Sequence, residues 1–399
     1  MAEALKDSKT RWLGQIPTDW DMVRVKDCFD RKNKKANQKD PIVLSLARSG
    51  VKIRDITSNA GQLAADYTNY NPVAKDDILI NPMDLVSGDN CNISKVEGVI
   101  SPAYVNLRYK KGINPRFYNY YFKLQYWLGA FFAHGYGVSF DNRWTLSYET
   151  LSKYPIILPP SEEQDKIANF LDEKCAEIDK LSEDIQKQID ILNDYKKSVI
   201  TRAVTKGLNP NAVMKDSGVQ WIGKMPEKWT VIPVKYCFNI ENGSDPKTDD
   251  GDTPVYGSGS KSFKKCVEFK KGPTVLLGRK GTVNIPQYVT GNYWNVDTAF
   301  NTKSKGNYDL KLFYYAACSF DYENYSTQTA LPSMTQSNYY NFRLPLMSQD
   351  EQKRIVAFLD DKCTEIDESI NSKREQIAKL DTYKKSIIYE YVTGKKKVA

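Results

Sequence analysis

Two long stretches of the chain place apolar residues at alternating intervals of three and four positions. The stretch from Ser161 to about Thr205 contains neither glycine nor proline, and such spacing is typical of a helix with one apolar stripe. Its apolar positions are Leu171, Ile178, Leu181, Ile185, Leu192, Tyr195 and Val199. The stretch near the end of the chain has Leu359, Ile366, Leu380, Tyr383 and Ile387. The pattern predicts long helices over residues 161–206 and 348–399.

The residues that flank the first stretch indicate its ends. Pro159 and Pro160 precede Ser161, which is a typical N-cap residue, and Gly207 and Pro210 follow the last apolar position. These residue types favour a helix that begins at Ser161 and ends before Gly207.

An amphipathic helix of this length cannot bury its apolar stripe alone, and the chain contains two matched ones. We therefore predict an antiparallel coiled coil between them. At ~1.5 Å per residue, roughly 35 to 40 paired residues form a rod of roughly 50 to 60 Å. Gln188 and its counterpart Gln376 fall on the inner seam, where a polar residue can fix the register of the helices. The alternative is that both lie at the solvated edge of the seam.

The sequence repeats itself in two parts. Residues 6–29, KDSKTRWLGQIPTDWDMVRVKDCF, return at 215–238 as KDSGVQWIGKMPEKWTVIPVKYCF. Residues 164–200, which begin QDKIANFLDEKCAEID, return at 352–388, which begin QKRIVAFLDDKCTEID. A similar head, a dissimilar middle and a similar tail thus occur twice, which indicates a fixed scaffold with two interchangeable middles. Neutral drift of a duplicated domain is the alternative, but drift should blur heads, middles and tails alike.

The second middle has the pattern of short strands. Its segments DGDTPVYGSGSKSF, TVLLGRKGTVNIPQYV and YWNVDTAFN combine strand-forming residues with glycine turns,. Together with the long helices they predict an α+β fold. We expect two mixed α/β domains separated by a long antiparallel two-helix coiled coil and related by a pseudo-twofold internal repeat.

Length and composition agree with two globular domains. The chain has 399 residues, of which 41% are hydrophobic and 27% charged, which is enough for each domain to bury a core. The opening residues MAEALKDSKTRW lack the apolar run of a signal peptide,, and no segment approaches the ~20 apolar residues that cross a bilayer. The seven cysteines include no C-x-x-C pair, which favours reduced thiols. We expect a soluble, cytoplasmic protein, and its net charge of +8 weakly favours a polyanionic partner.

The sequence offers no recognisable catalytic or cofactor site. His134 is the single histidine, so a two-histidine metal motif is excluded, and we expect this residue to lie in a loop. The closest approach to a phosphate-binding loop, GSGSKS at 257–262, lacks the glycine directly before Lys261,. The acidic cluster Asp249, Asp250 and Asp252 in DPKTDDGD at 245–252 is expected to form a polar turn, and metal binding is the alternative. We predict no catalytic residue, metal or cofactor, so that a partner supplies any chemistry.

Three motifs occur in a fixed order along the chain. W-x-G-x-x-P-x-x-W opens each copy, L-P followed by E-x-Q or E-Q stands at each helix start, and TRAVTKGL at 201–208 leads into KDSGVQWIG. This combination resembles the DNA-specificity subunits of type I restriction-modification systems, over essentially the whole chain. The resemblance implies a first target recognition domain at 1–160, a conserved spacer helix at 161–206, a linker and second recognition domain at 207–347, and a second spacer helix at 348–399.

The resemblance also implies a function. In that family each recognition domain reads one half of a bipartite site in double-stranded DNA, while the helices set the spacer and dock two methyltransferase (modification) subunits. Those partners carry S-adenosylmethionine and methylate adenine, and restriction subunits with motor and nuclease activity can join them. The chain is therefore expected to be a non-catalytic specificity subunit. The alternatives are a coiled-coil DNA-organising protein without a methyltransferase partner, and a stand-alone nuclease or methyltransferase, whose motifs the sequence lacks.

The second middle contains the strongest candidates for contact with DNA. Arg279 and Lys280 stand between Gly278 and Gly281, on a turn from which long cationic side chains can reach a guanine edge or a phosphate. The family has a similar pattern at this turn, and a solvated hairpin tip is the alternative. Weaker candidates in the same middle are Tyr256, Ser258, Lys261, Gln328, Thr335 and Gln336.

The first middle offers candidates before and after its predicted strands. They are Arg48, Ser49, Lys52 and Arg54 in LSLARSGVKIRD, and Ser139, Asn142 and Arg143 in AHGYGVSFDNRWTLSYETL. For each of them a surface charge or a capped turn is the alternative. The tryptophans of the two heads are expected to anchor the core and not to stack on bases; they are Trp12, Trp20, Trp221 and Trp229.

Overall fold

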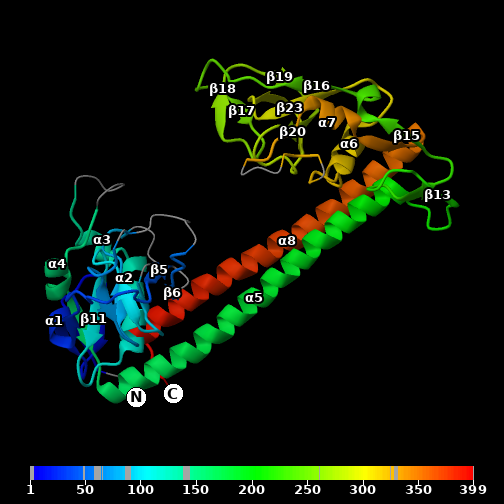
Figure 1. Ribbon diagram of the computed structural model, residues 1–399. Coiled ribbons are helices and arrows are strands. Elements are labelled where there is room, and N and C mark those ends of the chain that lie inside the picture. The colour runs from blue at the N-terminus through cyan, green and yellow to red at the C-terminus, as the bar shows by residue number, and fades with distance from the viewer. Residues whose placement is uncertain are drawn as a thin grey trace. The chain divides into compact units, whose positions relative to one another are not determined.

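Short sheets and helices alternate along the chain and form two units. The computed structural model describes residues 4–47, 50–57, 64, 66–85, 91–137, 144–259, 261–323, 325–327 and 331–398. Unit 1 comprises residues 1–184 and 376–399, and unit 2 comprises residues 185–375. Figure 1 shows sheets and helices in both units, so the fold class is α+β, as predicted. No helix in the described part of the chain is long and apolar enough to cross a membrane.

Unit 1 is built on a sheet with the strand order β4-β11-β8-β9, in which all neighbours are antiparallel. These strands are β4 Phe29–Arg31, β11 Val105–Tyr109, β8 Ile78–Ile80 and β9 Cys91–Ile93. The smaller antiparallel pairs are β1 Leu5–Asp7 with β2 Gln15–Pro17, β3 Asp21–Arg24 with β12 Pro155–Leu158, β5 Leu44–Ala47 with β6 Gly50–Ile53, and β7 Asn71–Val73 with β10 Gly98–Ile100. Every residue of β8 is buried, which accounts for its uninterrupted apolar sequence.

Helix α2, Pro115–Trp127, supplies much of the aromatic core of unit 1. It begins where the Asn114 side chain accepts hydrogen bonds from the backbone N–H groups of Arg116 at 2.8 Å and Phe117 at 3.2 Å. Proline at the first helical position suits this start, because the N–H that it lacks has no partner there. The shorter helices of the unit are α1 Val25–Cys28, α3 Ala130–Ala133 and α4 Tyr148–Lys153.

The described residues of unit 2 form two four-stranded sheets and two smaller pairs. The first has the order β16-β23-β20-β21, all antiparallel, with β16 Phe238–Asn242, β23 Ala299–Ser304, β20 Thr274–Gly278 and β21 Gln287–Val289. The second has the order β18-β17-β22-β19, with β18 Lys264–Cys266, β17 Thr253–Tyr256, β22 Asn292–Asn295 and β19 Lys270–Lys271. Only the β17–β22 pair is parallel among the described strands of this sheet. The short strands predicted for the second middle are thus confirmed.

The remaining elements of unit 2 frame these sheets. They are the pairs β13 Met214–Asp216 with β14 Lys224–Pro226 and β15 Thr230–Pro233 with β24 Arg343–Leu346, the 3-10 helix η1 Val234–Tyr236, and the helices α6 Leu310–Ala317 and α7 Gln336–Asn341. The side chain of Asp309 caps α6 by accepting from the backbone N–H groups of Lys311 at 2.8 Å and Leu312 at 2.9 Å. A capping side chain of this kind satisfies N–H groups that the helix itself leaves without a partner.

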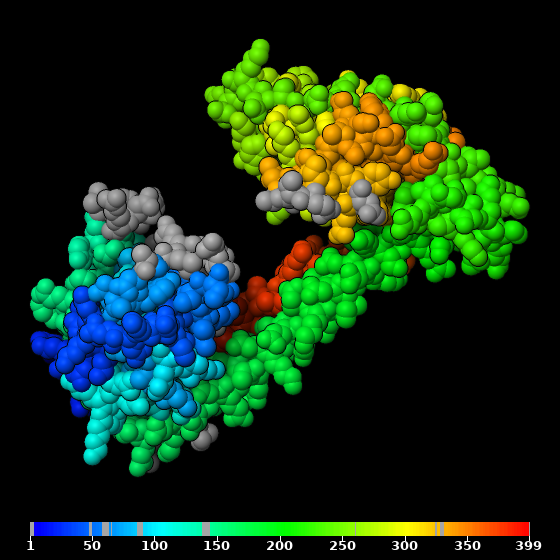
Figure 2. Space-filling view, in the orientation of Figure 1, coloured from blue at the N-terminus to red at the C-terminus, as the bar shows by residue number. Residues whose placement is uncertain are grey.

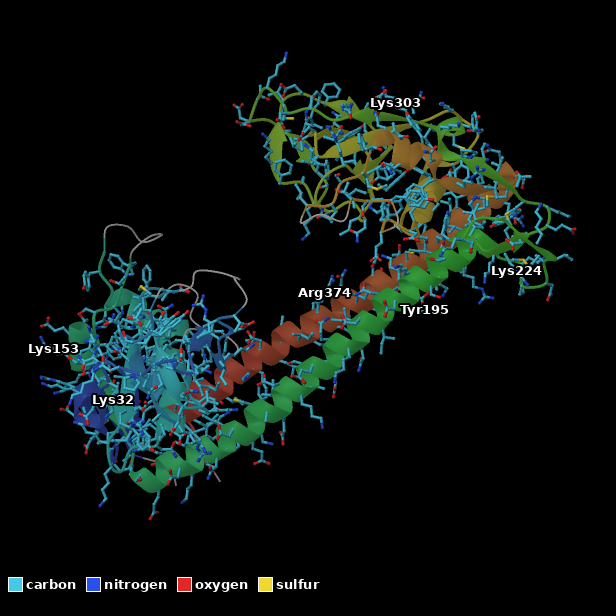
Figure 3. The ribbon with its side chains drawn as sticks, viewed as in Figure 1. Lys32, Lys153, Tyr195, Lys224, Lys303 and Arg374 are labelled. Carbon is cyan, nitrogen blue, oxygen red and sulfur yellow. The ribbon has the colours of Figure 1, made fainter. Side chains whose placement is uncertain are left out.

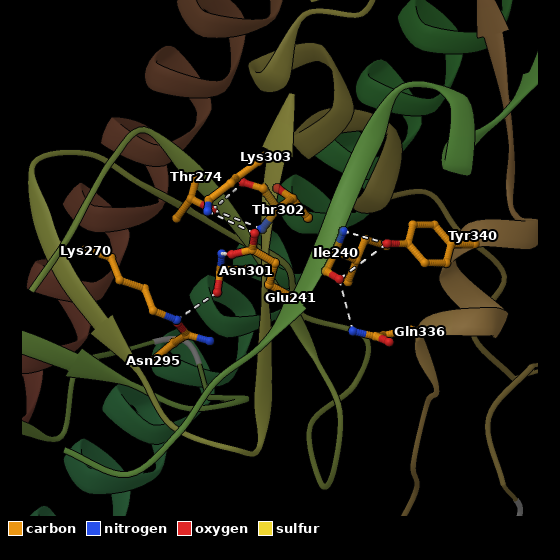
Figure 4. A network of polar contacts seen from close by, with 10 residues as sticks. All are labelled: Ile240, Glu241, Lys270, Thr274, Asn295, Asn301, Thr302, Lys303, Gln336 and Tyr340. Atoms are coloured by element: carbon orange, nitrogen blue, oxygen red, sulfur yellow. Dashed lines mark hydrogen bonds and ion pairs between the residues drawn. The ribbon is translucent and has the colours of Figure 1, made fainter. Parts of the chain in front are cut away.

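A polar network joins the two sheets of unit 2 (Figure 4). The ammonium group of Lys270 donates to Asn295 Oδ1 at 2.8 Å and to Asn301 Oδ1 at 2.9 Å. Asn295 belongs to β22 and Asn301 to β23, so one lysine holds a strand of each sheet. Burial lowers the pKa of Lys270 below its usual value. Its amide partners compensate for part of the loss of hydration.

Two long helices run through the chain, as the apolar spacing predicts: α5 spans Ser161–Lys206 and α8 spans Gln349–Val392. Within unit 1 they lie side by side and antiparallel. Lys384 Nζ lies 2.7 Å from Asp179 Oδ1, and the rings of Phe170 and Tyr391 pack with centroids 4.4 Å apart. Residue numbers therefore rise along α5 as they fall along α8.

The helix segments within unit 2 pair in the same sense. Lys196 Nζ lies 2.6 Å from Asp367 Oδ2, and Lys373 Nζ donates to Gln188 Oε1 at 2.5 Å. Buried apolar residues from both helices belong to the core of this unit, among them Ile200 and Leu359.

The buried stripe differs in part from the predicted seam. Leu171, Ile178, Ile185, Leu359, Ile366 and Ile387 are buried as predicted, but three other predicted seam residues are largely exposed: Leu181 by 49%, Tyr195 by 54% and Tyr383 by 57%. After several predicted seam residues, the next buried residue follows at an interval of four and not of three. These next buried residues are Cys175, Ile189, Cys363 and Ile370. The face by which the helices contact each other is therefore rotated relative to the predicted one, and Gln188 and Gln376 are exposed. The prediction that they lie on the inner seam was wrong, and the alternative, a solvated edge, holds. One side of α5 is open to solvent (Figure 2).

Candidate nucleic-acid interface

In each unit, a tryptophan of the head is hydrogen-bonded to the start of a long helix. In unit 1 the fully buried Trp20 donates its indole N–H to Glu163 Oε2, in the first turn of α5, at 2.8 Å. In unit 2 Trp229 is 2% exposed and donates to Glu351 Oε2, in the first turn of α8, at 3.0 Å. Both tryptophans are core anchors, as predicted.

The two partly buried head tryptophans also lie in the core region. Trp12 stacks on Tyr154 with ring centroids 5.6 Å apart, and Trp221 donates its indole N–H to the carbonyl of Arg343 at 3.1 Å. The side chain of His134 is also hydrogen-bonded to the backbone: its Nδ1 lies 2.8 Å from the carbonyl oxygen of Ala130. The hydrogen bond of this single histidine is thus one with the backbone of its own helix end.

The backbone of the turn that carries Arg279 and Lys280 is held on two sides. The Arg279 N–H donates to the carbonyl of Thr298 at 2.7 Å, and its own carbonyl accepts from Met334 N–H at 2.9 Å. The next residue forms an isolated antiparallel bridge, Lys280 with Ser333. The turn is therefore paired with a second segment and is not a free hairpin tip. A fixed backbone presents long cationic side chains from a defined position.

The two cationic side chains differ in their surroundings. Arg279 is partly buried, and its guanidinium Nη1 donates to the carbonyl of Asp297 at 3.3 Å. Lys280 is exposed. A guanidinium has five N–H donors, and among the described residues this one makes a single long bond to a carbonyl, which leaves most of its donors for a base edge or a phosphate. Arg279 is the better placed of the two for a bidentate contact.

The structure brings Ser258 close to this turn, whereas the side chain of Tyr256 packs against the buried residues Leu276, Val289 and Tyr293. The carbonyl of Tyr256 accepts from Val296 N–H at 2.9 Å, which places the end of β17 beside the segment that leads to Thr298. A Cβ atom on Gly281 would lie 3.5 Å from Ser258 Oγ, so no bulky group separates the two. Lys261 follows this segment and is exposed.

Two weaker candidates have a role in the fold of unit 2. The Thr335 hydroxyl accepts from Asn338 N–H at 3.1 Å and caps α7. The Gln336 amide donates to the carbonyl of Ile240 at 3.0 Å (Figure 4), so it is partly engaged on β16. Their contact with DNA stays a prediction, and Gln328 lies outside the described residues.

Two of the candidates predicted in unit 1, Lys52 and Arg54, lie in the described residues, and their contact with DNA stays a prediction. Lys52 is exposed on β6, whose partner strand β5 ends at Ala47. The backbone N–H of Arg54 donates to the carbonyl of Val43 at 2.8 Å, which continues the pairing beyond β6. Asn92 supports the hairpin from β9, because its side-chain amide donates to the carbonyl of Ala47 at 3.0 Å. The other candidates of this unit lie outside the described residues: Arg48, Ser49, Ser139, Asn142 and Arg143.

Sequence reasoning missed two exposed apolar residues at the unit 2 surface. Phe263 is 60% exposed and Leu331 is 61% exposed. For Phe263 the available signal was the run KSFKKCVEFKK at 261–271, in which each of two phenylalanines is followed by two lysines.

The described residues offer little for metal or thiol chemistry. Among them, no group of three or more histidine, cysteine, aspartate or glutamate side chains is placed to hold a metal ion. The acidic stretch at 245–252 instead makes an ion pair, between Asp249 Oδ1 and Lys264 Nζ at 2.8 Å. All seven cysteines lie in the described part of the chain, and each is free. Burial raises the pKa of the Cys91 thiol to about 12, which opposes formation of the reactive thiolate.

Comparison with known families accounts for both units. The model of the type I restriction modification DNA specificity domain matches residues 17–190 and again residues 226–379. The chain belongs to this family. Membership assigns it the function of a DNA sequence-specificity subunit of a type I restriction-modification system.

Relatives and a solved structure agree with the family. The chain is 25% identical to the Type I restriction enzyme MjaVIII specificity subunit of Methanocaldococcus jannaschii, over 96% of this chain and 94% of the relative. It is 26% identical to the Putative type I restriction enzyme MjaX specificity subunit of the same organism, over 64% of this chain and 63% of that one. A chain from a structural study of "complex assembly and conformational transition of the type I R-M system" has a TM-score of 0.67 at 14% identity, covering 94% of this specificity subunit and 98% of that chain. This last likeness concerns the fold.

Proposed function

We propose that each unit of this specificity subunit reads one half of a bipartite site in double-stranded DNA. Unit 2 reads its half through the surface around Arg279 and Lys280, and unit 1 reads the other half through the surface around β5 and β6. The chain itself catalyses no reaction and binds no cofactor or metal. Two methyltransferase subunits bring S-adenosylmethionine and the methyl transfer, and restriction subunits can join them.

The observation that carries this proposal is the way in which the Arg279 turn is held. Its backbone is fixed by Thr298 and by Met334, while most of its guanidinium donors remain for an outside partner. Bidentate recognition of guanine requires a cationic fork that is presented from a defined position. The net charge of +8 favours the DNA backbone as the surrounding partner surface.

The long helices have two roles in this proposal. Pairing of α5 with α8 as an antiparallel coiled coil, within a duplicated chain, sets the number of base pairs between the half-sites. The helices also dock the methyltransferase subunits. Support for docking comes from unit 2, where Tyr195 and Phe358 line a groove of about 590 Å³ at the end of α5. Tyr195 projects from this helix (Figure 3), and exposed aromatic residues are typical of protein interfaces.

The proposed function also implies the cellular compartment. A subunit that aims methyltransferases at chromosomal DNA works in the cytoplasm, where thiols remain reduced. A DNA-organising protein without a methyltransferase partner is the remaining candidate. Purification of the chain with a co-expressed methyltransferase distinguishes the two, because only a specificity subunit forms a complex that methylates adenine at a bipartite sequence.

Substitution of Arg279 tests the reading surface. In the complex with its methyltransferase, Arg279→Ala should weaken binding to the specific site by about 1 to 3 kcal/mol and relax specificity at one base pair of one half-site. The measurement is the equilibrium Kd for the specific duplex and for duplexes with each base pair replaced. Equal weakening on all duplexes would mean that Arg279 contacts only phosphate.

Arg374→Ala is the matched control for this experiment. Arg374 is an exposed arginine on α8 of the same unit (Figure 3), and its guanidinium has a hydrogen bond of 3.4 Å to Asn371. Its loss removes the same charge without touching the Arg279 turn. We expect unchanged base preference, and an equal loss of specificity in both variants would argue against the proposed surface.

Removal of one heptad from each long helix, at opposing positions, tests the spacer. The expected result is a complex that methylates sites with a shorter spacer, since seven residues correspond to ~10 Å of helix. The measurement is adenine methylation in a plasmid library with spacers of different length. The control is a variant in which the same two heptads are replaced by different heptads, so that the length of each helix is unchanged. An unchanged spacer after the deletion would refute this role of the helices.

A further inference from the structure

Two of the exposed apolar residues of unit 2, Phe263 and Leu331, flank the Arg279 turn on different segments. The Phe263 N–H donates to the carbonyl of Val255 at 3.1 Å, which extends the pairing of β18 with β17. A Cβ atom on Gly257 would lie 3.7 Å from Phe263 Cε1. The phenyl ring therefore lies beside the Tyr256–Ser258 segment and not at the far end of the strand.

Leu331 reaches the same surface from the other side of the turn. A Cβ atom on Gly281 would lie 3.7 Å from Leu331 Cδ1 and 3.5 Å from Ser258 Oγ. The segment that begins at Leu331 is fixed nearby, because the carbonyl of Pro332 accepts from Gly281 N–H at 2.9 Å. Two large apolar side chains thus border the surface that carries the cationic and hydroxyl groups.

The charges around these residues select the class of partner. Exposed Lys261, Lys265 and Lys280 lie on the same segments as Phe263 and the Arg279 turn, while Lys264 is paired with Asp249. A surface with lysines around apolar groups fits a polyanion that also has apolar features. In the major groove of DNA, the apolar feature of a base pair is the C5 methyl group of thymine.

We propose that Phe263 and Leu331 are specificity-determining residues that bury thymine methyl groups in the half-site read by unit 2. This inference rests on the proposed reading of DNA by that surface. Cationic groups identify guanine or hold phosphate, whereas the two apolar residues distinguish thymine from cytosine and from unmethylated pyrimidines. Exposure of both side chains in the free protein is then explained, because bound DNA covers them.

The test compares thymine with deoxyuridine, which lacks only the C5 methyl group. Equilibrium binding of the complex with its methyltransferase is measured on duplexes in which each thymine of the unit 2 half-site is replaced in turn. The wild-type complex should lose about fourfold in affinity at the contacted position, the value expected for one buried methyl-sized group. Phe263→Ala or Leu331→Ala should lose affinity on the thymine duplex and show no further loss on the deoxyuridine duplex.

Phe269→Ala provides a matched control. Phe269 is also 60% exposed, but it lies beyond the opposite end of β18, next to Glu268, whose carboxylate accepts from Lys247 N–H at 2.8 Å. This variant should keep the wild-type response to deoxyuridine. If it behaves as Phe263→Ala does, or if wild type tolerates every replacement, the inference is overturned.

The outcomes separate this inference from the function on which it rests. If the wild type shows no preference for a bipartite site, the proposed function fails. If the wild type is specific and Arg279→Ala relaxes that specificity, but neither apolar variant alters the deoxyuridine response, only the present inference fails. A unit 2 half-site that contains no thymine overturns it as well.

Discussion

The two units share a frame of contacts although their middles have unrelated sequences. Each head tryptophan donates to a glutamate in the first turn of a long helix, Trp20 to Glu163 at 2.8 Å and Trp229 to Glu351 at 3.0 Å. The glutamine that follows each glutamate accepts a backbone N–H from the residue that caps α2 or α6, at 2.8 Å and 2.7 Å. The frame therefore secures the same element of each unit through side chains that occur in both copies.

A further pair of contacts keeps its geometry while its residues change. In unit 1 the carboxylate of Asp172 accepts from Arg116 at 2.6 Å and from the hydroxyl of Tyr120 at 2.8 Å. In unit 2 the carboxylate of Asp360 accepts from Lys311 at 2.7 Å and from Tyr315 at 2.6 Å. Arginine and lysine substitute for each other here because the carboxylate needs one cation and one hydroxyl, and not a bidentate fork.

The central sheets of the two units also have matching strand orders. The order β4-β11-β8-β9 of unit 1 has its counterpart in β16-β23-β20-β21 of unit 2. Beside this sheet, unit 1 has the antiparallel pairs β5–β6 and β7–β10, which the parallel bridge Val43–Val99 joins, and unit 2 has β17–β18 and β19–β22, which the parallel pair β17–β22 joins. Sequence divergence of the middles has therefore changed the residues on these segments, among them those proposed to face DNA, and has kept the pattern of strand pairing.

The largest effect should come from the head tryptophans. Trp20→Ala and Trp229→Ala each remove a buried indole and should lower the free energy of unfolding of their unit by about 3 to 5 kcal/mol. Denaturant unfolding followed by hydrogen exchange of peptides from each unit gives the measurement. If the frames are equivalent, the two losses agree and each is confined to its own unit.

Phenylalanine at the same positions separates packing from hydrogen bonding. Trp20→Phe and Trp229→Phe keep an aromatic ring but leave the glutamate without the indole N–H. We expect a smaller loss than for alanine, because most of the apolar area remains buried. A loss in one unit but not in the other would show that the frames only look alike.

Much of this frame could be predicted from the sequence. The positions of the long helices follow from apolar spacing, and the burial of Trp20 and Trp229 follows from their repetition in both heads. The seam itself was only partly predictable, because intervals of three and of four both fit the sequence of α5. Packing selects between them, and it left Leu181 and Tyr195 exposed.

The candidate site was less accessible to sequence reasoning. Arg279 and Lys280 could be found because glycines flank them, but their pairing with the segment at Ser333 joins residues far apart in the chain. The cap role of Thr335 and the exposure of Phe263 likewise depend on tertiary neighbours. Local sequence patterns identify turns, whereas long-range strand pairing determines which other segments lie beside a turn.

A smaller effect should come from the glycines that follow the long helices. Gly207 after α5 and Gly394 after α8 both have φ of +70°, a conformation that costs other residues about 1 to 2 kcal/mol. A Cβ atom on Gly207 would lie 3.0 Å from Trp229, and one on Gly394 would collide with Pro17 and lie 3.1 Å from Trp20. Gly207→Ala should therefore destabilise unit 2, and Gly394→Ala should destabilise unit 1, although it changes a residue near the end of the chain.

Gly14→Ala and Gly223→Ala are the controls that give this experiment its meaning. Both glycines have φ of +63° and no atom within 4 Å of the added Cβ, so alanine there measures backbone strain alone. Any loss beyond the control measures the packing of a helix end against a head tryptophan. If Gly394→Ala lowered the free energy of unfolding no more than Gly14→Ala does, the end of α8 would not stabilise the first head. The two units would then share only the contacts at the starts of the long helices.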